Sequence, residues 1–137
     1  MAYRFELVSP ERRLASQEVS AVRIPGADGD LTAMEGHTPV VTSLRPGVLT
    51  VETGGGEESF AVTGGFAEIG AEGCTVLAEQ ALPSGDVDQA TYDDWVADAR
   101  AKRDAAPEAG VDAAVKLVED MVAMGGHIGL DPGQPNL

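Results

Sequence analysis

The chain has 137 residues, of which 43% are hydrophobic and 23% charged, as in an ordinary globular domain or a small domain with an appendage. No run of about 18 apolar residues is present, so the sequence predicts no transmembrane helix. The 23 acidic and 9 basic residues give a net charge of −14, which argues against direct contact with nucleic acid or anionic lipid, because both require clustered Lys and Arg. The first residues show neither a signal peptide nor a transit peptide pattern, so we expect the chain to stay in the compartment where it is made.

The first 82 residues carry the pattern of short β-strands separated by turns. Tyr3, Phe5 and Leu7 alternate with polar residues, which is the period of a half-buried strand. Further strand signals, bounded by glycine or proline, lie at residues 18–24, 47–53, 58–63, 66–69 and 74–79. Turns that recur roughly every 8 to 12 residues are typical of a β-sandwich or a β-barrel.

The period changes after Pro83. Tyr92, Trp95, Val96 and Ala99 lie on one face of a predicted helix, for which Asp86 or Asp88 supplies the N-cap. A second apolar stripe follows a break at residues 105–110, and its members are Val111, Ala114, Val115, Val118, Met121 and Val122.

Two apolar stripes joined by a short loop predict an antiparallel helical hairpin. We expect Gly125 and Gly126 to end its second helix. The predicted organisation is therefore a β domain over residues 1–84, a hairpin over 85–126, and a flexible tail rich in Gly and Pro over 127–137.

The residue types that usually carry chemistry are scarce. Cys74 lies in an apolar strand, where a free cysteine usually acts as a small hydrophobic residue. His37 lies in a polar loop without a Ser or Cys nucleophile motif, and His127 lies in the tail. The glycines at 54–56 and 26–30 match neither a P-loop nor an EF-hand. The residues alone therefore indicate a non-catalytic binding or assembly module without a metal or cofactor.

Six short motifs then occur in order along residues 5–81. They read LVSPER from residue 7, IPGADGDL from 24, GHTPVVT from 36, LRPGVL from 44, AVTGGFAEI from 61 and TVLAEQA from 75. Each motif is weak by itself, but their order and spacing resemble the epsilon subunit of F-type ATP synthases. The resemblance implies a ten-stranded N-terminal β-sandwich followed by a C-terminal antiparallel two-helix hairpin.

This resemblance also implies a function. The chain would be a non-catalytic central-stalk subunit whose sandwich docks on the gamma subunit and on the ring of c subunits and turns with them, while ATP is made on other subunits. The hairpin could reach the alpha and beta subunits. No cofactor is implied. The complex would hold the chain at the cytoplasmic side of the bacterial plasma (inner) membrane, as a peripheral subunit without membrane contacts of its own.

Individual residues can be compared with the family by position. Asp30 matches the acid that reaches the polar loops of the c ring, and Ser9, His37 and Thr42 match positions that face gamma. Each also has a local alternative, because Ser9 can start a turn and Thr42 can be an ordinary strand residue. Thr91 stands where nucleotide-binding members have Arg, so the resemblance implies no nucleotide site here.

The sequence also departs from the family. Thr32 and Glu35 stand where Gly and Pro are common, which leaves the shape of the docking loop open. Residues 88–137 hold ten acids and four bases, whereas the inhibitory helix of many relatives is basic. We therefore predict a hairpin that stays folded against the sandwich and inhibits ATP hydrolysis weakly or not at all.

Two alternative functions have weaker support in the sequence. A stand-alone ligand-binding β-sandwich for a carbohydrate or peptide should carry an aromatic platform, but only 4% of the chain is aromatic. A hydrolase built on His37 is the third hypothesis.

Overall fold

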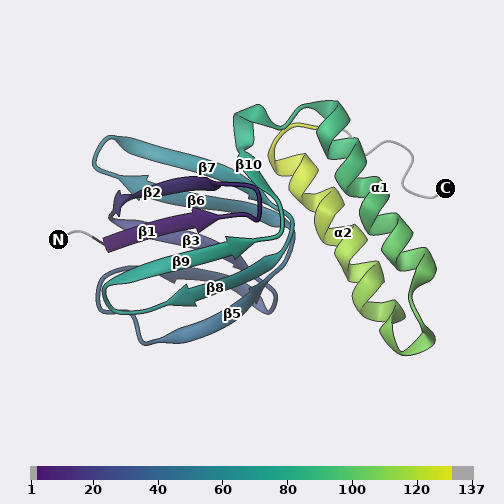
Figure 1. Cartoon of the computed structure of the whole chain (residues 1–137), viewed down its shortest axis with the longest axis horizontal. Coiled ribbons are helices and arrows are strands. Elements are labelled where there is room, and N and C mark those ends of the chain that lie inside the picture. The colour runs from purple at the N-terminus through teal and green to yellow at the C-terminus, as the bar shows by residue number, and fades with distance from the viewer. Residues whose placement is uncertain (1–2, 131–137) are drawn as a thin grey trace. The chain divides into compact units, whose positions relative to one another are not determined.

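The computed structural model describes residues 3–130 and divides into two compact units, residues 1–84 and residues 85–137. The first unit contains all ten β-strands and the second contains both α-helices (Figure 1). The part of the predicted tail at 131–137 lies outside the described residues.

The ten strands of the first unit follow one another closely along the chain. They are β1 (Tyr3–Val8), β2 (Arg13–Val19), β3 (Ala21–Gly26), β4 (Gly29–Ala33), β5 (Val40–Leu44), β6 (Gly47–Thr53), β7 (Gly56–Val62), β8 (Gly65–Ile69), β9 (Gly73–Ala78) and β10 (Ala81–Pro83).

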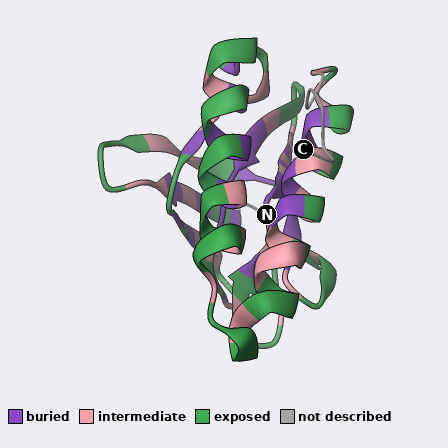
Figure 2. Ribbon diagram, turned by 90° about the vertical axis from the view of Figure 1, so that its right-hand side faces the viewer, coloured by how far each residue is buried: buried purple, intermediate pink, exposed green. Residues whose placement is uncertain are grey.

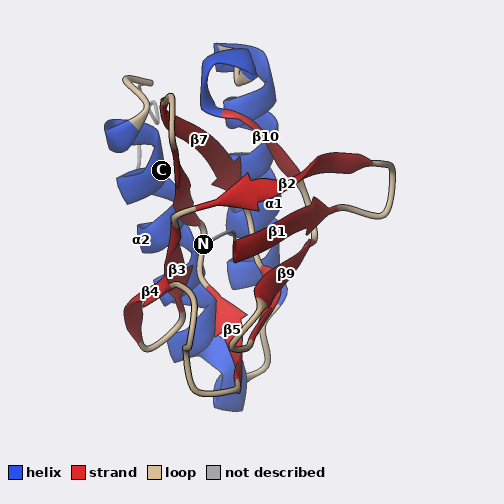
Figure 3. Ribbon diagram, turned by 90° about the vertical axis from the view of Figure 1, so that its left-hand side faces the viewer, coloured by secondary structure: helices blue, strands red, loops and turns tan. Residues whose placement is uncertain are grey.

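These strands form one folded sheet in the order β10-β7-β6-β3-β5-β8-β9-β1-β2, with β4 paired to β3. The pairs are antiparallel except for β1, which runs parallel to β9 and antiparallel to β2 (Figure 3). Strand β3 pairs with β6 over residues 21–23 but reaches β5 only through Gly26 and Leu44. The sheet turns at this narrow join, which gives the predicted ten-stranded sandwich.

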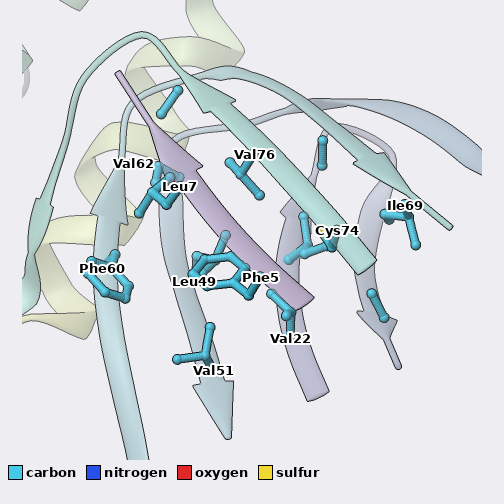
Figure 4. Close-up of a cluster of buried hydrophobic side chains, with 14 of the residues drawn as sticks. Phe5, Leu7, Val22, Leu49, Val51, Phe60, Val62, Ile69, Cys74 and Val76 are labelled. Carbon is cyan, nitrogen blue, oxygen red and sulfur yellow. The ribbon is translucent and has the colours of Figure 1, made fainter. Parts of the chain in front are cut away.

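Side chains from both halves of the sheet fill the core (Figure 4). Tyr3, Phe5 and Leu7 are fully buried, as the alternation predicts, and the rings of Phe5 and Phe60 lie 6.4 Å apart. Cys74 is also buried, and burial raises the pKa of its thiol to about 12. The expectation that this cysteine packs as a hydrophobic residue is confirmed.

The sequence pattern contains no separate signal for β2, β4 and β10, although the family resemblance implied the full number of strands. The run at 18–24 is not one strand but the end of β2 and the start of β3. It divides at Ser20, whose backbone N–H donates to the carbonyl of Glu52 at 2.7 Å. Residues 13–18 of β2 are half-buried or exposed, so no apolar alternation marks the strand.

The second unit contains α1 (Gln89–Ala105) and α2 (Val111–His127), with short 3-10 turns at Ser84–Asp86 and Glu108–Gly110. Asp88 is the N-cap of α1, and its Oδ1 accepts the backbone N–H of Thr91 at 2.8 Å. This bond lowers the pKa of Asp88. The predicted stripe of α1, including Tyr92 and Trp95, is buried, whereas exposed residues cover the opposite side (Figure 2).

The predicted end of α2 at Gly125 and Gly126 is wrong, because the helix continues through both to His127. Ile128 is its C-cap, and Gly129 follows with a φ of 80°. The N–H groups of Leu130 and Gly129 donate to the carbonyls of Gly125 and Gly126 at 2.8 and 3.4 Å. This is the Schellman arrangement, in which a glycine beyond the helix takes the left-handed conformation.

Candidate protein-docking site

The described residues offer little for catalysis or metal binding. Within residues 3–130, no cluster of three or more His, Cys, Asp or Glu side chains could hold a metal ion. No α-helix in the same range has the length and apolar character needed to cross a membrane. Exposed apolar side chains, in contrast, lie side by side on the sheet.

The outer face of the sheet carries an unusual group of them. Phe66 is 57% exposed and Leu77 is 49% exposed, and these two residues face each other across β8 and β9. Leu77 also pairs with Val8 of β1, and Val41 of β5, which is 64% exposed, lies diagonally across from Phe66. We call these four residues the outer patch. Their strand neighbours point inward, so the outer patch follows from strand alternation and not from poor packing.

A pocket opens beside the outer patch. Its volume is about 370 Å³, and Val8, Pro10, Phe66 and Leu77 contribute to its mainly apolar wall. Glu79 also lines this pocket. An apolar pocket beside one acidic residue can bind an apolar side chain of a partner protein, if a basic residue of that partner lies next to it.

The structure places Ser9, predicted to face gamma, in the wall of this pocket. Ser9 also has the local role that the sequence left open. Its backbone N–H and its hydroxyl both donate to the carbonyl of Arg12, at 2.9 and 3.3 Å, and so close the turn between β1 and β2.

Asp30, the predicted c-ring residue, lies on β4 and forms an ion pair with Arg45. Arg45 is anchored in turn, because its Nη1 donates to the carbonyl of Gly26 at 2.6 Å and its backbone N–H donates to Pro25 at 3.0 Å. The Asp30 side chain is still 77% exposed. A carboxylate accepts several hydrogen bonds, so Asp30 can bind a second cation while Arg45 orients it.

Thr42 lies on β5, near Gly26 of β3. It pairs with Ala67, which is fully buried, so the Thr42 side chain points to the opposite side of the sheet from the outer patch. Its hydroxyl donates to the carbonyl of Ser43 at 3.3 Å. A Cβ at Gly26 would lie 3.6 Å from this hydroxyl oxygen, which is an ordinary contact.

His37 occupies a separate loop between β4 and β5. Its backbone N–H donates to Met34 at 3.0 Å, and its Nδ1 lies 2.6 Å from the carbonyl of Thr38. A carbonyl only accepts, so Nδ1 carries the proton in this contact. Gly36 ties the loop to the turn between β8 and β9 by donating to Ala71 at 2.9 Å.

The structure does not gather the three predicted gamma residues into one cluster. Ser9 directly follows Val8, and the strand pairing aligns Val8 with Ser43 near the end of β5. His37 lies before Val40, which is at the start of β5. Ser9 thus lies at the outer patch, the Thr42 side chain faces the other side of the sheet, and His37 lies apart. Sequence reasoning missed the exposed Phe66 and the anchoring Arg45.

Two positions marked as departures occupy ordinary places. Thr32 pairs with Arg23 inside β4, so a regular strand accommodates it without glycine. Thr91 lies in the first turn of α1, where Asp88 caps its backbone N–H.

Comparisons with known proteins agree with this architecture. The sequence model of the family described as ATP synthase, Delta/Epsilon chain, beta-sandwich domain matches residues 2–84. The ATP synthase epsilon chain of Paracoccus denitrificans is 54% identical over 140 residues, covering 97% of this chain and 95% of the relative. That of Rhodobacter capsulatus is 53% identical over 127 residues, covering 93% and 96%.

Solved structures share the fold. A chain in the mitochondrial ATP synthase of Euglena gracilis, a structure of OSCP, F1 and the c-ring, is 25% identical with a TM-score of 0.66, covering 89% of this chain and 80% of that chain. A chain in the central stalk and c-ring of the Tetrahymena thermophila enzyme is 15% identical with a TM-score of 0.61, covering 93% and 96%, and shows the fold alone. Since the family model matches well over half of the chain and the bacterial relatives align along nearly all of it, the chain belongs to the ATP synthase epsilon chain family, whose members are non-catalytic central-stalk subunits.

Proposed function

We propose that this chain is a rotor subunit of a bacterial proton-translocating F-type ATP synthase and couples the gamma subunit to the c ring. The observation that carries the proposal is the outer patch with its pocket, an apolar surface on a chain of net charge −14. The chain would lie at the cytoplasmic side of the plasma membrane and reach the membrane only through its partners.

The outer patch is the proposed contact with gamma. Burying Phe66 and Leu77 against a partner would remove two large exposed apolar side chains from water, at about 25 cal/mol per Å² of apolar area. Ser9 lies at the same pocket, in agreement with its expected role, and Glu79 favours a Lys or Arg on the partner. His37 and Thr42 would contact other parts of gamma, because they lie away from this pocket.

Asp30 is the proposed contact with the c ring. Arg45 holds one carboxylate oxygen, and the exposed remainder of the group would receive a cation from a c-subunit loop. The chain's own guanidinium thus presents Asp30 in one orientation, which lowers the entropy lost when the partner binds.

The hairpin is proposed to stay closed and to inhibit ATP hydrolysis weakly or not at all. Exposed acids such as Asp93, Asp98 and Glu119 leave it without the basic surface that acidic segments of alpha and beta would attract. Thr91 offers no cation to a nucleotide phosphate, so we propose no nucleotide site. Deleting residues 88–137 should leave ATP hydrolysis by the assembled complex nearly unchanged, and a several-fold rise would contradict this part of the proposal.

The gamma contact can be tested by capture on immobilised gamma. Phe66→Asp and Leu77→Asp should each weaken capture at least about tenfold, since each places an unpaired charge in an apolar contact. Val111→Asp is the matched control, because Val111 is 38% exposed but begins α2, where an acid is well tolerated. Capture of the Phe66 and Leu77 variants at the level of the control would contradict the proposal.

The c-ring contact can be tested in membranes that make ATP from a proton gradient. Asp30→Arg should lower synthesis strongly, because it places a cation beside Arg45 and against the proposed cationic loop. Arg45→Gln keeps the acid but removes its anchor, so it should have a smaller effect. Unchanged synthesis with Asp30→Arg would rule out this role of Asp30.

A further inference from the structure

Tyr92, in the first turns of α1, is fully buried and bound to the far end of α2. Its hydroxyl donates to the carbonyl of Met121 at 3.1 Å and lies 3.4 Å from the carbonyl of Val122. This bond joins residues 29 positions apart, at the end of the hairpin where no loop connects the helices.

Gly125 makes room for this ring. A Cβ atom at Gly125 would overlap the Oη and Cζ atoms of Tyr92 and lie 2.8 Å from Cε1. The neighbouring Gly126 has open space at the same position, with no atom within 4 Å. Glycine destabilises an α-helix by about 1 kcal/mol relative to alanine. Packing against Tyr92 explains a glycine at position 125 despite this cost, whereas no packing contact explains the glycine at position 126.

The other end of the hairpin contributes little burial. No residue from 100 to 117 is buried, whereas Val118, Met121, Met124 and Gly125 are all buried in the second half of α2. The loop at 106–110 already joins the helices covalently at the exposed end. Separation of the helices would therefore have to begin by freeing the end of α2 from Tyr92.

We propose that Tyr92 and Gly125 form a latch that keeps the hairpin closed. The ring fills the notch at Gly125, and the hydroxyl binds the carbonyls of the preceding turn of α2. The latch acts within the second unit and needs no ligand. Its consequence for ATP hydrolysis rests on the proposed function, in which the hairpin is closed and does not inhibit.

The test compares the two adjacent glycines in the full-length chain. Gly125→Ala should displace the ring and speed the hydrogen exchange of α2 amides at least about tenfold. Gly126→Ala should leave the exchange of these amides unchanged or slow it, because alanine favours the helix and meets no atom. Equal exchange in the two variants would overturn the latch.

Two further variants separate the latch from general unfolding. Tyr92→Phe keeps the ring and removes the hydroxyl, so it should speed exchange of the same amides about three- to tenfold while the β amides stay protected. Tyr92→Ala should speed the exchange of α2 amides far less in a chain that already carries Gly125→Ala than in the parent chain. The reason is that the added methyl group already occupies the notch. Additive effects would show that the two residues act separately and would overturn the proposal.

Helix separation can also be measured directly. Spin labels at Ala97→Cys and Ala123→Cys occupy exposed positions on the two helices, and the native Cys74 is buried with its pKa raised to about 12, so it reacts slowly. The distance distribution should be narrow in the parent chain and broad with Gly125→Ala. An equally narrow distribution in both would contradict the latch.

The consequence for hydrolysis is tested separately in the assembled complex. The free-chain measurements decide whether the latch exists, and ATP hydrolysis by complexes that carry Gly125→Ala tests the proposed function. Lower hydrolysis with Gly125→Ala would mean that a released α2 inhibits and that the latch prevents it. If hydrolysis is unchanged although the helices separate in the free chain, the latch proposal stands and the hairpin has no inhibitory function.

Discussion

The two units bury their apolar residues in different ways. In the β unit, side chains from nearly every strand meet in one core, and residues as distant along the chain as Phe5 and Phe60 are in contact. In the helical unit, the buried residues of α2 lie in its second half, and a single tyrosine bridges the open end. Contacts spread over many strands resist local opening, whereas contacts concentrated at one end allow it.

This difference suits different tasks. The proposed docking on gamma needs a rigid support, and the outer patch lies directly on strands whose inner faces form the core. A helical pair whose buried residues are concentrated at one end can be opened or kept closed by small changes at that end. We therefore expect loss of a core side chain to destabilise the whole β unit, and loss of a contact in the helical unit to act locally.

The largest expected effect is in the core of the β unit. Phe5→Ala should lower the free energy of unfolding by about 3–5 kcal/mol, because the ring is fully buried and leaves a cavity. Phe66→Ala is the control and should change it by less than about 0.5 kcal/mol in the free chain, because Phe66 is exposed. Chemical denaturation followed by circular dichroism measures both, and similar losses would contradict the assignment of Phe66 to a docking surface.

A smaller effect is expected at the turn into β8. Gly65 has a φ of 122°, and a Cβ there would overlap the carbonyl oxygen of Leu77 and lie 2.9 Å from the Cα of Ala78. Gly56 has a φ of 137° but open space. Gly65→Ala should therefore cost about 1–3 kcal/mol more than Gly56→Ala, which measures the backbone strain alone. Equal melting temperatures would refute the close approach of β8 and β9 at this point.

A still smaller effect is expected at the start of α1. The backbone N–H of Thr91 lowers the pKa of Asp88 below its ordinary value of 3.8, so the ionised cap stabilises the folded helix above that pH. This stabilisation should disappear as the pH falls through the lowered folded pKa. Asp88→Asn keeps a good N-cap at every pH. Helix content measured from pH 5 to pH 2 should fall less in Asp88→Asn than in the parent chain, and parallel curves would exclude the cap as the cause.

The smallest effect is expected from removing the helical unit. The residues of the β core all lie between Tyr3 and Ala81, so we propose that residues 1–84 form an independent domain. A chain that ends at Gly85 should keep its β-type circular dichroism and melt cooperatively. An unfolded spectrum for this shortened chain would disprove the division into two domains.

Local patterns in the sequence predicted some parts of the fold better than others. The strands with apolar alternation, such as β1 and β9, and the two amphipathic helices follow from their own residues. Strand β10 has only three residues and β4 is mostly exposed, so neither has a local signal, and both depend on their partners β7 and β3. Only the family resemblance supplied the full number of strands.

The end of α2 was mispredicted for a related reason. A pair of glycines usually stops a helix, but Gly125 is needed by Tyr92, which lies 33 residues earlier, and no local window contains both. The candidate site was limited in the same way. Strand alternation in β8 places Phe66 on the opposite face from the buried Ala67, but only the pairing of β8 with β9 brings Phe66 next to Leu77. The positions matched to the family, such as Asp30 and His37, stay predictions.

The parallel pairing of β1 with β9 has a consequence for synthesis on the ribosome. Residues 4–8 pair with residues 73–77, so β1 must wait until nearly the whole β unit has been synthesised before its second neighbour exists. Until then β1 can pair only with β2, and an isolated hairpin is marginally stable in water. At about 5–20 residues per second, this wait lasts several seconds, during which the apolar residues of β1 are exposed to chaperones and to other nascent chains.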